Sequence, residues 1–518
     1  MSGGFRQRMA WLHTWGGLWL GWLLYAIFLT GTLSVFDAAI TRWMRAAPPA
    51  TPVAAPDGAR ALRLAQAHLQ RVAMPAHAWR IDLPDAADPA LLLSWDDEQH
   101  RPHSARLDPA TGRVLPAAQV RETEGGHHFV HMHYQLHGGR AGLWVVGFCT
   151  VALLVALVSG IAVHRRIFRD FFTFRPGKGQ RSWLDAHNAV GVLTLPFQFM
   201  IAYTGLAVFY ATYLPAGIAA HYPDRGAYFQ ALLQEPSHRD ELHEAAPLLP
   251  LDGLLAQAEA SLQRRVGFVV VEHPGDRSAS VWMHGPFDEG RGQDRELLWL
   301  SGGRLLFDGV TGAVLDERPP RSRVGGAALL TLDAMSELHF ADFGGATVKW
   351  LYFFCGLAGT ALMATGTVLF LVKRRCKALG EFGACTAAVY RGIEVLNVGS
   401  IAGLAVACAG YLWANRLLPP GMEQRAGWEI AGFFAAWALA FAHAALRPAR
   451  RAWTEQWAAL AALCLLLPAL NAWTTGESLL SYAKRGDGLR LGLELTALAI
   501  GLAAASLAGW LARREPGP

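Results

Sequence analysis

The fold is decided by the first long apolar stretch, residues 11–36, which reads WLHTWGGLWLGWLLYAIFLTGTLSVF. It contains no Asp, Glu, Lys or Arg. A helix needs about 20 apolar residues to cross the hydrocarbon core of a bilayer. This stretch is long enough to cross, and no small-residue cleavage site follows it. We therefore expect a retained membrane span rather than a signal peptide.

Seven further stretches are also long and apolar. They are residues 143–163, 190–213, 348–372, 395–413, 428–445, 457–473 and 491–511. Of the 518 residues, 53% are hydrophobic and only 17% are charged, whereas soluble domains average about 25% charged residues. We expect a mainly α-helical membrane protein with about eight transmembrane helices. Because the net charge of +5 is modest, we expect the lipid bilayer and no nucleic acid as a partner.

The basic residues indicate how the chain crosses the membrane. Lys and Arg gather before the first span and after the second, fourth, sixth and eighth spans. If the spans alternate in direction, all five clusters lie on one side, which the positive-inside rule makes cytoplasmic. We therefore expect a multi-pass membrane protein with both termini in the cytoplasm. Two long segments then lie outside.

This topology divides the chain into spans and outer modules. The divisions are a first span (1–36), an outer module (37–140), the second and third spans with a basic cytoplasmic loop (141–213), a second outer module (214–346), a fourth span (347–376) and a C-terminal four-helix membrane extension (390–512). The outer modules contain no cysteine, so no disulfide framework supports them. We expect each module to fold on its own apolar core.

An internal duplication relates the two halves of residues 1–376. The first and third spans share a His, a Gly four residues later and a Thr-Gly pair, at an offset of 174. These are His13, Gly17 and Thr30-Gly31 against His187, Gly191 and Thr204-Gly205. The second and fourth spans share a further set at an offset of 206. These are His133, Gly139, Cys149 and Ser159-Gly160 against His339, Gly345, Cys355 and Thr365-Gly366.

The outer modules repeat as well. Each begins with a helical stretch, at residues 60–72 and 251–266, and alternating strands such as VVVEH and SVWMH follow in the second module. Each ends on a related strand–turn–strand motif, DPATGRVL at 108–115 and DGVTGAVL at 308–315. We expect small α+β modules in a duplicated span–module–span architecture.

The duplicated histidines are the candidate site. Histidine is costly inside hydrocarbon, so an intramembrane histidine is a functional hypothesis. The topology places His13 and His187 near the cytoplasmic face, and His133 and His339 near the outer face. Two imidazoles that face each other across a bundle suit axial ligation of a haem iron. Gly17 and its repeat Gly191 would leave room for a flat macrocycle. The alternative is that these histidines bond water or headgroups at the interface.

Other residues compete with this interpretation. His164 ends the second span and could join or replace His13 and His187, and His137 could replace His133; neither is duplicated. The stretch HHFVHMHYQLH at 127–137 could also bind a metal ion transiently. The Thr-Gly and Ser-Gly pairs are either helix-packing points or a cofactor lining. We expect Cys149 and Cys355 to be small packing residues. We expect Glu394, Glu429 and Glu494, near span ends, to be solvated.

These motifs together resemble the PepSY-associated transmembrane family. Within it, residues 1–376 are most similar to bacterial inner-membrane ferric-siderophore reductases. The resemblance implies a four-helix core, two periplasmic PepSY modules and two b-type haems with bis-histidine ligation by His13, His187, His133 and His339. It implies a haem-dependent ferric reductase, an oxidoreductase that reduces Fe(III) to Fe(II) in a periplasmic ferric-siderophore and so releases the iron. The spans after about residue 390 depart from the minimal family pattern.

The electron donor is not encoded in this sequence. No G-x-G-x-x-G fingerprint is present, and no cytoplasmic segment is long enough for a nicotinamide or flavin domain. We expect a separate reductase, a quinol or a small reductant as the donor. Two alternatives remain open: a non-enzymatic PepSY membrane sensor or protease regulator, which would be colourless, and a siderophore or metal transporter.

Overall fold

The computed structural model describes the chain except for residues 1–2, 47–56, 75, 85–89, 98, 100, 116–120, 164–178, 234–238, 286–302, 319–325, 342, 344, 377–380 and 514–518. The chain forms two compact units. The helical unit comprises Met1–Ala46, Arg121–Tyr213 and Met335–Pro518. The sheet unit comprises Ala47–Val120 and Leu214–Ala334.

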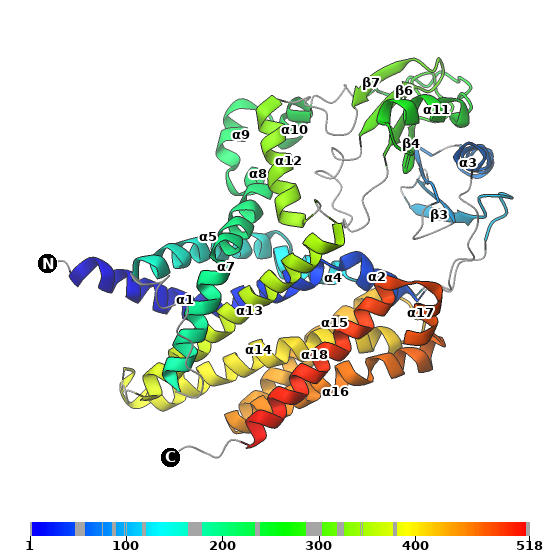
Figure 1. The fold of residues 1–518 in the computed structure, drawn as a ribbon. Coiled ribbons are helices and arrows are strands. Elements are labelled where there is room, and N and C mark those ends of the chain that lie inside the picture. Colours follow the sequence, from blue (N-terminus) through cyan, green and yellow to red (C-terminus); the bar gives the residue numbers. More distant parts are fainter. Residues whose placement is uncertain are drawn as a thin grey trace. The chain divides into compact units, whose positions relative to one another are not determined.

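Within the described residues, eight helices are long and apolar enough to cross a membrane, which confirms the expected number (Figure 1). They are α1 (Gly3–Ser34), α5 (Gly139–Val163), α7 (Gln180–Val208), α13 (Gly345–Cys376), α14 (Thr386–Leu417), α15 (Arg425–Leu446), α16 (Ala449–Thr475) and α18 (Gly488–Arg513). Their sequences are apolar around most of the helix, as burial in lipid and in a bundle requires. The protein is therefore a multi-pass, mainly helical membrane protein.

The four spans of the duplicated half form a closed ring. Helix α1 packs against α5 and α13, and α7 packs against the same two helices. Helices α1 and α7 therefore occupy opposite corners of the ring. Two shorter helices, α4 (His127–Gln135) and α12 (Gly326–Phe340), precede α5 and α13. The first residues of those spans, Gly139 and Gly345, have φ of 55° and 63°, which glycine adopts without a Cβ penalty.

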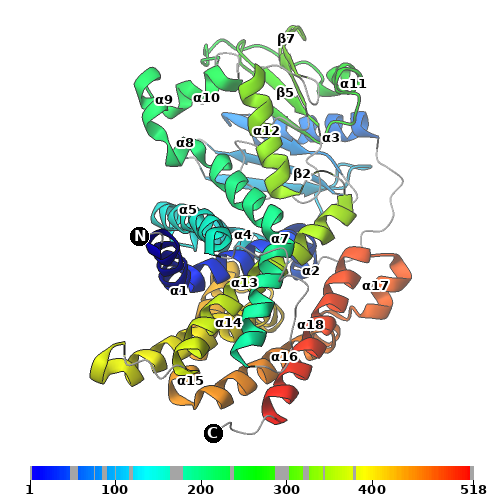
Figure 2. The same cartoon turned by 60° about the vertical axis from the view of Figure 1, so that its left-hand side comes forward.

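The appended helices form a second bundle in the same unit. Helix α14 packs against α15 and α16, and α16 packs against α18; α14, α16 and α18 can be followed from a second direction in Figure 2. Helix α14 also contacts α1 and α13, so the two bundles share an interface. The short helices α2 (Asp37–Arg45) and α17 (Leu479–Arg485) both pack on α18. Further short elements are α8 (Tyr210–Tyr213), α9 (Pro215–His221), α10 (Arg225–Leu233) and the 3-10 turn η1 (Gly383–Cys385).

The sheet unit is one antiparallel sheet in the order β3-β2-β1-β4-β5-β6-β7. The strands are β1 (Ala78–Asp82), β2 (Leu91–Asp96), β3 (Pro102–Leu107), β4 (Phe268–Glu272), β5 (Ser280–His284), β6 (Arg304–Asp308) and β7 (Val314–Arg318). Alternate residues of β1, β2, β4, β5 and β6 share one apolar core with α3 (Gly58–Val72) and α11 (Leu251–Leu262).

The expectation that each module folds on its own core is therefore wrong. Strand β1 of the first module pairs with β4 of the second, and residues of both modules fill one core. An unpaired β1 or β4 would expose a row of backbone N–H and C=O groups, and the mutual pairing satisfies both edges. The duplicated modules thus fold as a single α+β unit.

The elements expected inside the modules are confirmed. The two helical stretches form α3 and α11. The stretch SVWMH forms β5, and VVVEH lies in β4 except for its last residue, His273, which directly follows the strand. The repeated DxxTG motifs are turns: the carboxylate of Asp108 accepts the backbone N–H groups of Ala110 and Thr111, and Asp308 accepts those of Val310 and Thr311. These bonds hold the pKa of the Asp108 carboxyl below its usual value.

Candidate functional site: two opposed histidine pairs

The first pair lies inside the ring of four spans. His13 of α1 and His187 of α7 come from opposite corners of that ring, and their ring centroids are 6.3 Å apart with an interplanar angle of 74°. The two residues are equivalent in the duplication and 174 positions apart in the sequence. The structure therefore brings together the two histidines that the repeat related.

The second pair is built from the helices that lead into spans α5 and α13. His133 of α4 and His339 of α12 have ring centroids 6.1 Å apart and an interplanar angle of 27°. Each pair thus takes one histidine from each copy of the duplication. Two imidazoles that approach each other in this way can both ligate a metal ion between them.

All four rings are oriented through the same nitrogen. Nδ1 of His13 bonds Ala156 O at 2.9 Å, and Nδ1 of His133 bonds Ile27 O at 2.8 Å. Nδ1 of His187 and of His339 each lie 3.1 Å from a threonine hydroxyl, of Thr365 and Thr204 respectively. Both hydroxyls already donate to backbone carbonyls, so they accept the imidazole N–H. In every ring the lone pair therefore falls on Nε2.

The repeated Thr-Gly and Ser-Gly pairs hold these rings. A Cβ added at Gly31 would lie 2.5 Å from His133 Nδ1, and one at Gly205 would lie 2.9 Å from His339 Cε1. At Gly160 and Gly366 the corresponding distances, to Cε1 of His13 and of His187, are 3.2 and 3.3 Å. Each dipeptide thus packs one histidine of the other span in its own half. They are close-packing points, and what they pack is an imidazole.

The contacts between glycines and histidines are reciprocal within each half. Span α1 carries His13 and packs against His133 at Gly31, while α5 packs against His13 at Gly160. Helix α7 carries His187 and likewise packs against His339 at Gly205. Each half therefore fixes its own two rings, and the two halves face each other through the pairs.

The glycines one turn beyond the first pair have no packing role among the described residues. A Cβ at Gly17 would meet nothing within 4 Å, and one at Gly191 would meet only Leu362 Cδ1 at 3.4 Å. Glycine inside a helix costs about 1 kcal/mol relative to alanine. Gly17 and Gly191 therefore lower helix stability although no neighbour crowds either position. The missing side chains leave space beside the first pair.

The second pair is held in its neutral form. Burial lowers the pKa of His133, and burial together with the adjacent His133 ring lowers the pKa of His339 to about 3. Neutral imidazole is the form that ligates metals. The rings can therefore serve as ligands over the physiological pH range without first losing a proton.

One competing histidine, His137, lies elsewhere. His137 Nε2 lies 3.0 Å from His128 Nδ1, and its ring packs on His128 and Phe434 rather than on His339. His164 lies outside the described residues. Of the other residues in the 127–137 stretch, His131 lies 3.0 Å from Glu124, while His128 is fully buried against Tyr411 and Phe433. Burial lowers the pKa of His128 strongly, so this ring is neutral too.

Two glutamates expected to be solvated are buried, so that expectation is wrong. Glu429 and Glu494 have no exposed surface. Glu429 forms an ion pair with Arg425, which is equally buried, and accepts a hydrogen bond from Asn415 Nδ2 at 2.6 Å. Glu494 accepts hydrogen bonds from Trp43 Nε1 at 3.0 Å and from Asn471 Nδ2 at 2.8 Å. Asparagines and arginines also occur near these span ends. They could have indicated buried glutamates, because a carboxylate that is buried needs such partners and a solvated one does not.

The remaining glutamate and the repeated cysteines play packing or surface roles. Glu394, whose side chain is 15% exposed, pairs with Arg375 at 3.0 Å in the first turns of α14. Cys149 is fully buried among the apolar residues of α1, α5 and α7, and Cys355 is partly buried. The expectation that Cys149 is a packing residue is confirmed.

The sequence matches a model of the PepSY-associated TM region over residues 10–373. The chain belongs to this family. The match covers both histidine pairs and both modules, and ends at the close of α13. The chain is also similar to an uncharacterized protein of Pseudomonas aeruginosa, with 30% identity over 335 residues that cover 62% of this chain and 79% of that protein. The bundle α14–α18 lies beyond the family match.

Proposed function

We propose that this PepSY-family protein transfers electrons across the bilayer through two b-type haems, one held by each histidine pair. The observation that carries the proposal is the presence of two opposed pairs, at 6.3 and 6.1 Å, with every Nδ1 engaged. Two haems with bis-histidine ligation would use all four duplicated histidines.

The separation of the rings fits two ligands on one metal. A histidine nitrogen lies about 2.0–2.1 Å from a bound transition metal, and roughly 1.1 Å from its own ring centroid, so two opposed ligands have centroids about 6.3 Å apart. The distances of 6.3 and 6.1 Å between the ring centroids agree with this value. The two interplanar angles differ, but rotation of either ring about the metal–nitrogen axis leaves ligation intact.

The surroundings of the rings fit a non-covalent macrocycle. The space at Gly17 and Gly191 lies one helical turn from the first pair, on the same face of each helix. The Nδ1 bonds fix the tautomer and raise the basicity of Nε2, as outer-shell partners of metal-bound histidines do. The sequence contains no C-x-x-C-H attachment motif, which favours haem b over haem c.

The two pairs lie at different levels along span α1. His13 and Gly31, which packs against His133, are both in α1 and are separated by 18 positions, or about 27 Å of helix. The hydrocarbon core is about 30 Å thick. The two sites would therefore lie near opposite faces of the bilayer. When bound, haem iron supplies one-electron chemistry, while the protein provides its ligands and an apolar enclosure.

The substrate we propose is Fe(III) held by a siderophore on the outer side. Support for this finer assignment comes from the resemblance of residues 1–376 to ferric-siderophore reductases. Hard oxygen donors hold Fe(III) more tightly than Fe(II), so reduction by one electron releases the metal and leaves the siderophore whole. The donor would be a separate reductase, a quinol or a small reductant on the cytoplasmic side, and the membrane would be the bacterial inner membrane.

An absorption spectrum of the purified full chain tests the haem assignment. We expect the narrow bands of low-spin haem after reduction with dithionite, and two haems per chain by chemical assay. A folded protein that is colourless despite ample haem supply would overturn the assignment and favour a PepSY sensor.

A separate measurement tests the substrate. The haem-loaded protein is reduced anaerobically and mixed with a ferric hydroxamate or catecholate complex in the presence of an Fe(II) chelator. We expect reoxidation of the haem together with formation of the coloured Fe(II) chelate. Haem that stays reduced with every ferric complex would reject siderophore reduction while leaving electron transfer intact.

A further inference from the structure

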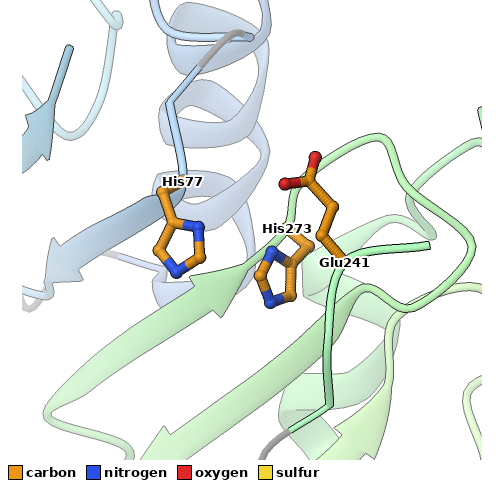
Figure 3. A group of neighbouring side chains, drawn as sticks. All are labelled: His77, Glu241 and His273. Atoms are coloured by element: carbon orange, nitrogen blue, oxygen red, sulfur yellow. The ribbon is translucent and has the colours of Figure 1, made fainter. Parts of the chain in front are cut away.

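The sheet unit brings three metal-ligating side chains together where the two modules join. His77, Glu241 and His273 place one ligand atom each within 4.8 Å of one another (Figure 3). His77 directly precedes β1 and His273 directly follows β4. The register pairs Ala78 with Glu272, so the two histidines occupy the next opposed position, and His273 N donates to His77 O at 2.9 Å. Their ring centroids are 4.5 Å apart.

His273 is the fixed member of the group. His273 is only 3% exposed, and its Nε2 lies 3.0 Å from Arg239 O. Since a carbonyl oxygen only accepts hydrogen bonds, Nε2 carries the proton and Nδ1 carries the lone pair. The backbone of His273 has φ of 49°, a left-handed conformation that costs energy for a residue with a side chain.

Glu241 lies on a segment that is clamped to the same loop. The Asp276 carboxylate accepts the backbone N–H of Leu242 at 3.1 Å and of Glu244 at 2.8 Å. Arg239, on the other side of Glu241, pairs with Asp308 at 2.8 Å. The Ser278 hydroxyl, which donates to the same carboxylate at 2.6 Å, and these backbone N–H groups hold the pKa of Asp276 well below its usual range, so the clamp is ionised at neutral pH. The Glu241 backbone is therefore fixed on both sides, while its carboxylate is exposed.

We propose that His77, Glu241 and His273 bind a divalent first-row transition-metal ion at the junction of the two modules. Two imidazoles and one carboxylate suit Zn²⁺, Fe²⁺ and related ions, whereas Mg²⁺ and Ca²⁺ prefer oxygen ligands alone. Two of the donors are exposed and one is buried and oriented, so the ion keeps coordination positions open to solvent. The proposal concerns the sheet unit alone and does not depend on haem in the helical unit.

The site joins elements that are distant in the sequence. His77 belongs to the first module, and Glu241 and His273 belong to the second. A metal ion held by all three would bridge the β1–β4 pairing through side chains in addition to the backbone ladder. Binding should therefore stabilise the junction between the modules, by mass action on the folded state.

Equilibrium dialysis of the full chain against Zn²⁺, followed by metal analysis, tests the proposal. The protein is purified in detergent with a tag that contains no histidine. The variants are His77→Ala and Glu241→Gln, because both side chains are exposed and their loss spares the core. The matched control is His103→Ala, which removes an exposed histidine of the same unit that lies 3.0 Å from Asp97.

We expect each of the two variants to bind one zinc ion fewer per chain than the wild type at low micromolar Zn²⁺, or to bind it at least tenfold more weakly. The His103→Ala protein should match the wild type. Zinc held by other histidines of the chain would appear equally in all four proteins and cancel. Unchanged stoichiometry and affinity in both His77→Ala and Glu241→Gln, or an equal loss in His103→Ala, would overturn the proposal.

Discussion

The two bundles of the helical unit bury polar side chains in opposite ways. In the ring of α1, α5, α7 and α13 and in the helices α4 and α12 that lead into it, the central polar groups are imidazoles, and hydroxyls or carbonyls contact each Nδ1. In the bundle of α14–α18, the central polar groups are charged, and arginines, glutamates and asparagines bond one another. The first arrangement orients single rings through one nitrogen. The second arrangement joins charged and amide side chains to one another and to backbone carbonyls.

The charged network of the second bundle also anchors parts of the first half. Arg416 donates to the carbonyls of Trp43, at 2.6 Å, and Met44, at 3.2 Å, at the end of α2. Arg425 donates to Glu122 O at 2.7 Å, and Thr123 donates to Glu429 at 2.5 Å, just before α4. Because α4 carries His133, the appended helices hold the chain on the approach to the second pair. The difference between the bundles is therefore between a site and its support.

The largest effect is expected from removing a histidine of a pair. We expect His187→Ala or His339→Ala to lose one of the two proposed haems, because that haem would keep only one of its two protein ligands. Haem quantified per chain, with spectra of the oxidised and reduced protein, measures this. His137→Ala is the matched control and should keep both haems, since His137 packs on His128. Loss of a haem in His137→Ala, with His133→Ala unaffected, would reassign the ligand.

The second effect breaks the charged bundle instead. Glu429→Leu leaves the Arg425 guanidinium buried without its counter-charge, which costs about 3–5 kcal/mol of stability. We expect a much lower unfolding temperature, but two haems in each chain that remains folded. The double variant Arg425→Met/Glu429→Leu should recover most of the loss, because it removes the unpaired charge. If the double variant is as unstable as the single variant, the ion pair stabilises the fold by more than the compensation of one buried charge by the other.

A smaller effect on haem retention should distinguish the two histidine pairs. Gly205→Ala places a Cβ 2.9 Å from the His339 ring, and Gly366→Ala places one 3.3 Å from the His187 ring. Crowding of this kind costs about 1–3 kcal/mol. We expect weaker haem retention at the second pair in the first variant and a milder loss in the second variant. Gly492→Ala in α18, where a Cβ meets nothing within 4 Å, is the control and should leave haem binding unchanged.

The effect that is smallest at neutral pH concerns a buried neutral histidine that belongs to neither bundle. His284 is 2% exposed and stacks on Phe268, and burial, with Arg304 and Arg80 nearby, lowers its pKa to about 3. The unfolded chain, with a pKa of about 6.5, binds a proton at a pH where the folded chain does not. Stability of the sheet unit should therefore fall by up to about 1.4 kcal/mol per pH unit as pH decreases from about 6.5 to about 3.

Proteolysis of the full chain at a series of pH values measures this effect, because cleavage within the sheet unit reports its opening. His284→Phe keeps a ring against Phe268 and removes the titrating group. The slope of stability with pH should be shallower in this variant than in the wild type. An identical slope would assign the acid sensitivity to other groups.

Sequence reasoning was strongest where a copied pattern carried the information. The duplication related His13 to His187 and His133 to His339, and the structure brings these residues together in the same two pairs. The non-duplicated His137, an equally plausible candidate by position, lies against His128 instead. In both pairs, equivalent residues of the two halves lie against each other, so repetition in sequence corresponds directly to contact in the structure.

Sequence reasoning failed where partners came from distant segments. The places of Glu429 and Glu494 near span ends predict solvated carboxylates, yet Thr123 and Trp43 reach them from the first half of the chain. The hydroxyl-glycine pairs were recognised, but what they pack against was not. Those partners lie on other helices. Hydrophobic periodicity does not show how far a helix is rotated about its axis, or shifted along it, relative to its neighbours.

The sequence alone determined the number of spans, the duplication and the equivalence of the four histidines, because apolar length and copied spacing are written along the chain. Only the tertiary structure decided that the two modules share one sheet, that the glutamates are buried, and that His77 meets Glu241 and His273. Those outcomes depend on which strand edges and helix faces approach each other after folding. Such approaches are set by the combined packing of segments more than a hundred residues apart, which no local pattern records.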